Sequence, residues 1–137
     1  MRMIFVNLPV SDLARSRAFY EGMGFSINPQ FSDDEGACVV ISDTIYLMIL
    51  TRAKFEGFAP NPVADPRTTT GSLIALSCDS REEVVAMVNA ALTNGGSDTG
   101  KVQDMEGFMY GRSICDPDGH VFEPFWMNPA AVEGQPA

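Results

Sequence analysis

One order of elements, strand–helix–strand–strand–strand, is predicted twice in this chain of 137 residues, and this repeat constrains the fold more than any other feature. The first copy opens with a short apolar run that ends at Pro9, and Ser11 is a candidate N-cap for the helix that follows. Polar breakers separate the three later strands. The elements of this copy are expected at residues 3–8 (strand), 13–23 (helix), and 25–31, 37–42 and 45–50 (strands).

The second copy follows a stretch that contains three prolines. Ser80 and Glu83 have the spacing of a capping box, in which each side chain accepts a hydrogen bond from the other residue's backbone N–H. The segment DPDG at 116–119 is a strong turn signal between the last two strands. The elements of this copy are expected at residues 73–78 (strand), 81–94 (helix), and 108–115 and 120–126 (strands), with a weaker strand at 97–103.

Each unit of this kind has an open apolar face, and two such units can bury their faces by pairing. The sequence therefore predicts an α+β fold in which two paired βαβββ units form a curved mixed sheet around a cleft. We expect one domain over residues 1–137, with units at 2–50 and 73–127 joined by a loop at 51–72. A concave sheet is a usual place for a ligand, and the long loop is expected to cover that ligand or to run over the surface.

The chain is acidic, with 9 Lys and Arg against 18 Asp and Glu and a net charge of −9 at pH 7. Such a charge repels phosphate backbones, so we expect no nucleic-acid partner. The three cysteines form no C-x-x-C unit and are expected to be small buried side chains rather than a disulfide framework or a thiolate metal site. The N-terminal apolar run is too short for a signal peptide, and no segment reaches membrane-spanning length. These features predict a cytoplasmic protein with no membrane partner.

Two segments, LPVSDLARSRAFYEGMGF near the start and DPDGHVFEPFW near the end, resemble the vicinal oxygen chelate superfamily. This superfamily includes glyoxalase I, bleomycin-resistance proteins, fosfomycin-resistance proteins and extradiol dioxygenases. The resemblance covers about residues 2–127 and implies the glyoxalase/bleomycin resistance/dioxygenase fold, with the site enclosed by the curved sheet. Relatives often dimerise, and apolar residues continue through Phe122, Phe125 and Trp126 to the end of the last strand. We therefore expect a homodimer.

The resemblance also implies a divalent metal, held by histidine or glutamine on the first strand of each unit and by glutamate on the last. Carried over to this chain, the first strand offers Phe5 and Asn7, the second unit has Leu73 where a histidine is usual, and the last strand keeps Glu123. The strand at 45–50 has no Glu, Gln or His. One carboxylate does not hold a transition metal tightly. We therefore expect no cofactor, room only for a weakly bound divalent metal at Glu123, and no metal-dependent glyoxalase I reaction.

Without those ligands, the cleft is predicted to be a pocket with apolar and aromatic walls around Glu123. Strand alternation assigns most of its lining and turns His120 to the opposite face from Glu123, where it is expected to be exposed to solvent or to support the turn. The parity of the strand that carries Tyr46 and Met48 stays open, and the same stripe of residues is also compatible with plain core. The expected ligand-binding residues are Phe5, Asn7, Tyr46, Met48, Leu73, Ala75, Tyr110, Arg112, Val121 and Phe125.

Three functions are compatible with such a cleft. The first is a protein that binds a small, partly aromatic and cationic molecule. The second is a lyase (lactoylglutathione-lyase-like), isomerase or dioxygenase of the superfamily that uses Glu123 as a catalytic base or single metal ligand. The third is an interaction module without chemistry. A two-residue hairpin would also place Arg112 opposite Glu123, where its guanidinium would supply the positive charge that a metal supplies in relatives.

Overall fold

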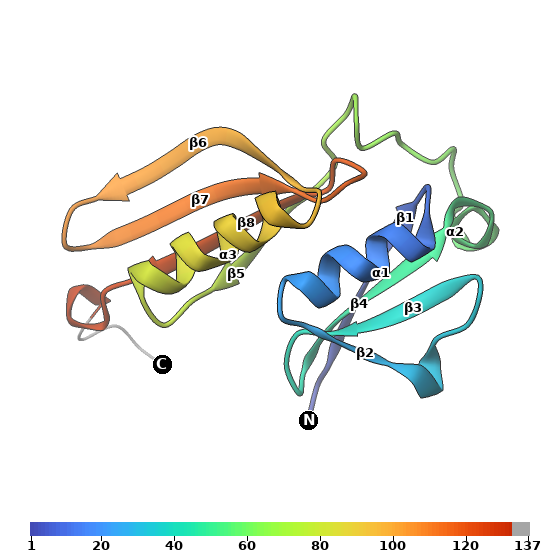
Figure 1. The fold of residues 1–137 in the computed structure, drawn as a ribbon, viewed down its shortest axis with the longest axis horizontal. Coiled ribbons are helices and arrows are strands. Elements are labelled where there is room, and N and C mark those ends of the chain that lie inside the picture. Colours follow the sequence, from blue (N-terminus) through green and yellow to red (C-terminus); the bar gives the residue numbers. More distant parts are fainter. Residues whose placement is uncertain (133–137) are drawn as a thin grey trace.

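The structure is a computed structural model in which residues 1–132 are described, and it contains two four-stranded sheets, one from each half of the chain (Figure 1). The first half forms β1 (Ile4–Val10), α1 (Leu13–Gly22), β2 (Ser26–Asn28), β3 (Gly36–Val40) and β4 (Ile45–Thr51). The second half forms β5 (Leu73–Ser77), α3 (Arg81–Thr93), β6 (Ser97–Met105), β7 (Met109–Cys115) and β8 (Val121–Met127). The predicted α+β fold of two βαβββ units is confirmed.

The two sheets have the same topology. Their strand orders are β1-β4-β3-β2 and β5-β8-β7-β6, and in each the first strand runs parallel to the last while the other neighbours are antiparallel. Figure 1 shows α1 and α3 on the same side of the molecule, each in front of its own sheet. Each sheet therefore has one face under a helix and one open face.

Alternation along the strands decides which residues reach each face. In β1, Leu8 and Val10 are buried under α1, whereas Phe5 and Asn7 are exposed on the other side. One cluster of buried residues draws on both halves, which means that the two units share a hydrophobic core. Its members include Leu8, Val10, Phe19, Leu47, Ile49, Leu76, Val88, Ile114 and Phe122.

The turn at 116–119 connects the second unit to the start of α1. The buried carboxylate of Asp118 accepts hydrogen bonds from the backbone N–H of Ser11 at 3.0 Å and from its hydroxyl at 2.7 Å. Asp116 accepts a bond from the hydroxyl of Tyr20 at 2.7 Å, and Nε2 of His120 lies 2.7 Å from the carbonyl oxygen of Pro9. The predicted turn thus also holds the two units together.

Two local details of the first unit differ from the sequence prediction. Asp12 rather than Ser11 is the N-cap of α1, because the side chain of Ser11 is used by Asp118. The strand expected at 25–31 stops at Asn28 and continues as a 3-10 turn, Pro29–Phe31, since proline has no N–H for the ladder.

The connection between the units also contains a helix. It is α2 (Arg52–Phe58), whose N-cap is Thr51, so residues 51–72 are only partly a loop. The weak strand expected at 97–103 is a full strand, β6, and its hairpin with β7 is joined through Gly107. No helix within residues 1–132 is both long and apolar enough to cross a membrane.

Candidate functional site

Two cavities adjoin on the open face of the β5–β8 sheet, and we call their combined space the trough. The larger has a volume of about 780 Å³ and lies between the sheet and the connection at Pro66–Thr70. The smaller has a volume of about 280 Å³ and is lined by Ala75, Met109, Gly111 and Phe125. Three residues line both cavities: Lys101, Ser113 and Glu123.

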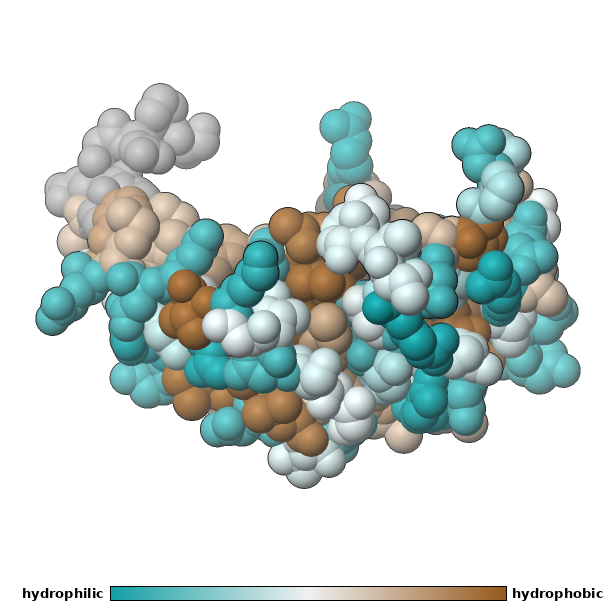
Figure 2. All heavy atoms as spheres, turned by 90° about the horizontal axis from the view of Figure 1, so that it is seen from above, coloured by the Kyte–Doolittle hydropathy of each residue, from teal (hydrophilic) through white to brown (hydrophobic). Residues whose placement is uncertain are grey.

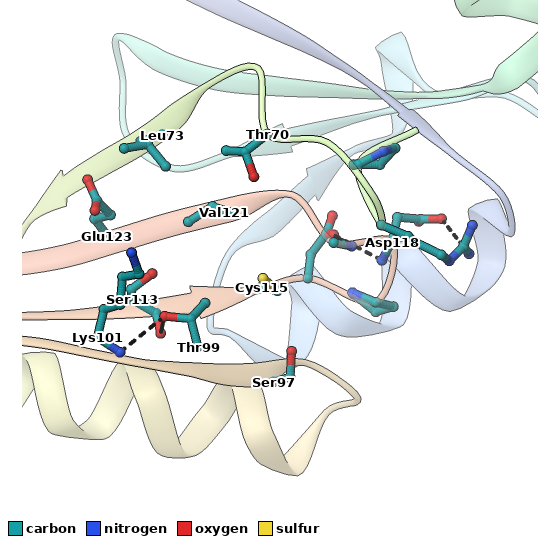
Figure 3. A pocket seen from close by; sticks show the side chains of 15 residues that line it. Thr70, Leu73, Ser97, Thr99, Lys101, Ser113, Cys115, Asp118, Val121 and Glu123 are labelled. Atoms are coloured by element: carbon teal, nitrogen blue, oxygen red, sulfur yellow. Dashed lines mark hydrogen bonds and ion pairs between the residues drawn. The ribbon is translucent and has the colours of Figure 1, made fainter. Parts of the chain in front are cut away.

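These three residues form one row across the sheet, which we call the polar row. The register of β7 and β8 places Ser113 opposite Glu123. Lys101 lies in the irregular stretch of β6 just before Val102, which pairs with Arg112, and it lines both cavities together with Ser113. Glu123 pairs with Ala75 on the other side, so the row ends at β5 with a small side chain. Figure 3 shows the side chains of Lys101, Ser113 and Glu123 on the same face, at one end of the larger cavity.

Hydroxyl and apolar groups line the rest of the larger cavity. Ser97 and Thr99 precede Lys101 on alternate positions of β6, and Thr99 donates a 3.3 Å hydrogen bond to the carbonyl oxygen of Ser113. Leu73 and Val121 supply the apolar part of this wall (Figure 3). Apart from Glu123, the trough is therefore polar along β6 and apolar along β5 and β8.

The connection between the units borders the trough because it is fixed to the 116–119 turn. The guanidinium of Arg67 donates to the hydroxyl of Ser11 at 3.0 Å and to Asp118 at 3.3 Å. Gly119 has a φ of +104°, and a Cβ there would lie 2.6 Å from the carbonyl oxygen of Pro66. Only glycine fits both this backbone conformation and this contact.

Burial controls the titratable groups at the inner end of the trough. Burial raises the pKa of the Asp116 carboxyl, against the opposing effects of His120 and of the hydrogen bond from Tyr20. Burial also raises the pKa of the Cys115 thiol, only partly offset by its hydrogen bond with Ser97. The thiol in the cavity wall is therefore protonated at neutral pH and is a poor nucleophile.

The residues of the trough do not fit the divalent metal that the resemblance implies. The corresponding positions offer Asn7, Leu73 and one carboxylate, Glu123, and the nearest charged side chain along the polar row is the Lys101 ammonium, which repels a cation. Within residues 1–132, no three His, Cys, Asp or Glu side chains gather closely enough to hold a metal ion. A hard divalent ion needs several oxygen ligands, and this donor set does not supply them.

The structure brings some of the predicted site residues together and separates others. Leu73, Ala75, Arg112, Val121, Glu123 and Phe125 line the trough.

The predicted residues of the first unit lie on the open face of the other sheet. There the ring of Phe5 stacks on Tyr46 with centroids 4.6 Å apart, and Met48 pairs with Asn7 in the β1–β4 ladder. Asn7 borders a separate apolar cavity of about 480 Å³ beside Phe55 and Phe58.

The predicted pairing of Arg112 with Glu123 is wrong. The N–H of Asp116 donates to the carbonyl oxygen of His120, so the hairpin loop has three residues rather than two and the register moves by one. Ser113 therefore faces Glu123, and the guanidinium of Arg112 binds Asp98 and the hydroxyl of Tyr110. A shift of one residue exchanges the two faces of a strand.

Tyr110 lies on the helix-covered face and does not line the trough. It is buried against Cys78 and Val84, and the guanidinium of Arg81 lies 3.9 Å from the centre of its ring. Sequence reasoning missed Ser97, Thr99 and Lys101, although polar side chains at alternate positions indicate one solvated face of a strand.

The first unit and the whole fold are similar to known proteins. Residues 2–42 match the model of the bleomycin resistance protein-like N-terminal family. No curated protein matches this chain in sequence.

Among solved structures, a hypothetical protein from S. aureus has 26% identity and a TM-score of 0.76, over 92% of this chain and 94% of that one. A glyoxalase/bleomycin resistance protein/dioxygenase family enzyme from Burkholderia phytofirmans has 16% identity and a TM-score of 0.76, over 93% of this chain and 100% of that one. A bleomycin resistance determinant encoded on the transposon Tn5 has 20% identity and a TM-score of 0.63, over 93% and 99%. The N-terminal part of the chain is therefore similar in sequence to the bleomycin resistance protein-like N-terminal family, and the whole chain has the fold of solved glyoxalase/bleomycin resistance proteins.

Proposed function

We propose that this chain is a binding protein that holds a small, partly aromatic molecule in the trough without a tightly bound metal. The observation that carries the proposal is the pair of adjoining cavities, with volumes of about 780 and 280 Å³. Ligand pockets are commonly about 300–1,000 Å³ and combine apolar walls with a few polar groups. Because this space is open rather than filled by the chain's own side chains, it argues against an interaction module without a ligand.

The smaller cavity is the place for the aromatic part of the ligand. Phe125 and Met109 supply apolar surface, and the small residues Ala75 and Gly111 leave room for a ring beside them. Aromatic rings prefer offset or edge-to-face contacts with each other, and Phe125 offers one such partner.

A thermal-shift and ligand-observed NMR screen tests the proposal with aromatic amines, aromatic acids, neutral aromatic compounds and free amino acids. We expect members of at least one class to raise the melting temperature, because a ligand that binds only the folded state stabilises it. Ala75→Phe fills the smaller cavity and is expected to abolish the shift. Ala86→Phe places the same ring on the exposed face of α3 and should leave the shift in melting temperature unchanged. Absence of any shift across the library contradicts the proposal.

An enzymatic function that uses Glu123 is the second candidate. The ion pairs of the described residues include neither Lys101 nor Glu123, so no ion pair ties up the carboxylate in the trough. Such a group can take a proton from a bound substrate. A glyoxalase assay with and without added divalent metal tests it, with Glu123→Gln as the inactive control. No turnover under either condition removes a glyoxalase reaction from consideration.

We also propose that the chain forms a homodimer. Phe122 and Trp126, whose apolar character suggested a dimer, pack in the core. The support comes instead from Phe5 and Leu73, which are 45% and 59% exposed. On the face seen in Figure 2, hydrophobic residues reach the surface in several places among hydrophilic ones. Light scattering at micromolar concentration tests the dimer, and a particle of 14.9 kDa contradicts it.

A further inference from the structure

We infer that the ligand of the trough is a zwitterion of the α-amino-acid type, with its carboxylate at Lys101, its ammonium at Glu123 and its apolar substituent against Phe125. This inference rests on the proposed binding function and specifies its ligand. It starts from the polar row, because Lys101 and Glu123 are opposite charges that line the same two cavities from strands on either side of β7.

The separation of β6 and β8 leaves room for a short zwitterion between the two charged side chains. Neighbouring strands lie about 4.8 Å apart, so residues aligned on β6 and β8 are separated by about 9.6 Å. The ammonium and carboxylate of an α-amino acid lie about 3 Å apart. Both side chains are flexible, so their head groups can make charge-assisted contacts of about 2.8 Å with the two ends of such a molecule. A ligand with one charge satisfies only one end of the row.

The middle of the row fits the same ligand. Ser113 is 5% exposed and lies between Lys101 and Glu123, so its hydroxyl is within reach of a carboxylate bound at Lys101. A hydroxyl can donate to that carboxylate or accept from the ammonium, and it therefore suits the junction of the two charges.

The other charged groups around the trough already have partners within the protein, including Arg112, whose guanidinium is paired with Asp98. Asp118 is paired with Arg15 and Arg67, and Asp116 accepts hydrogen bonds from Tyr20 and from backbone N–H groups. Of the charged groups that line the trough, Lys101 and Glu123 are therefore the pair that a ligand can engage without breaking an ion pair of the described residues.

Three probes with one aromatic group test the inference by isothermal titration calorimetry: phenylalanine, phenethylamine, which lacks the carboxylate, and 3-phenylpropionate, which lacks the ammonium. We expect phenylalanine to bind at least about tenfold more tightly than either, which corresponds to about 1.4 kcal/mol for each added charge contact. Equal affinity of phenylalanine and either singly charged probe overturns the inference. So does no binding of phenylalanine at about 10 mM, which limits its binding free energy to less than about 2.7 kcal/mol.

Substitutions in the polar row test its two charge contacts separately. Lys101→Met should reduce the affinity for phenylalanine to that for phenethylamine, and Glu123→Gln should reduce it to that for 3-phenylpropionate. The chain has one other lysine, Lys54 on α2, so Lys54→Met is a matched control that should change nothing, and Glu21→Gln on α1 is the matched control for the carboxylate.

The outcomes distinguish this inference from the proposed function. In one outcome, aromatic compounds of the library bind the native chain but not Ala75→Phe, and the three probes show no preference for the zwitterion. The binding function then stands, and the inference about its ligand is wrong. If no library compound binds, the proposed function fails, and the inference fails with it. If Lys54→Met weakens phenylalanine binding as much as Lys101→Met does, the charge acts at a distance and the row is not the site.

Discussion

The two units have the same topology, but their open faces have opposite chemistry. In the first, Phe5 stacks on Tyr46, and the neighbouring cavity is lined by apolar residues of β4 and of α2 and the segment after it. In the second, Lys101, Ser113 and Glu123 cross the sheet in a row. The helix-covered faces are alike because both contribute apolar residues to one core. The repeat therefore preserves the buried face, whereas the open face is free to differ between the units.

The largest expected effect comes from breaking the connection between the units. Asp118→Ala removes a carboxylate that is 3% exposed and leaves the donors of Ser11, Arg15 and Arg67 without their partner. We expect the free energy of unfolding, measured by urea denaturation, to fall by about 3 kcal/mol. Asp104→Ala breaks an exposed pair with Arg81 and should cost less than about 1 kcal/mol. Equal costs would show that the turn does not couple the units.

A smaller loss is expected when the contact between the turn and the connection is broken. Gly119→Ala adds a Cβ at a φ of +104° and 2.6 Å from the carbonyl oxygen of Pro66, and we expect it to cost about 2 kcal/mol. Gly107→Ala also has a positive φ, +74°, but its Cβ meets no atom within 4 Å. The control should therefore cost about 1 kcal/mol, the strain alone. Thermal unfolding of both variants checks the difference, and a control as costly as Gly119→Ala argues against the contact.

The pH dependence of stability tests a second link between the two units. Tyr20 lies in the first unit, and its hydroxyl donates a hydrogen bond to Asp116 in the second. Burial, followed by the charge of Asp116, raises the pKa of its hydroxyl well above the ordinary value. Above about pH 10, Tyr20 loses its proton in the unfolded state but keeps it in the folded state. The contribution of Tyr20 to the free energy of unfolding is therefore fully present below about pH 10 and is lost as the pH rises further.

Tyr20→Phe is expected to cost about 1 kcal/mol at neutral pH and to reduce the alkaline loss of stability. Urea denaturation at neutral and alkaline pH measures both effects, and an absorbance titration follows the phenol directly. Ionisation of Tyr20 near pH 10 in the folded protein would contradict its burial.

The smallest change in stability is expected at the polar row itself. Lys101→Met and Glu123→Gln should each alter the free energy of unfolding by no more than about 0.5 kcal/mol, because no ion pair of the described residues depends on either group. Chemical denaturation without ligand measures this. A large loss from either variant would mean that the row supports the fold.

The sequence predicts the helix-covered faces of the two sheets much better than their open faces. Strand and helix positions follow from apolar periodicity, and Glu123 follows from the motif that carries it. The register of the last hairpin does not follow, because the DPDG segment permits a loop of two or of three residues, and this one residue decides whether Arg112 or Ser113 faces Glu123. Lys101 was missed for a related reason, since β6 is exposed along its whole length and its apolar residues show no regular alternation.

The exposure of β6 also has a consequence for self-association into fibres. β6 is an edge strand of nine residues, and such strands can template the addition of further chains. Its ladder with β7 is interrupted between Asp98 and Val102, where Gly100 has a φ of +85°. The interruption bends the edge, and Lys101 and Asp104 place charges along it. The same strand that contributes the cation of the trough is therefore protected against open-ended strand addition.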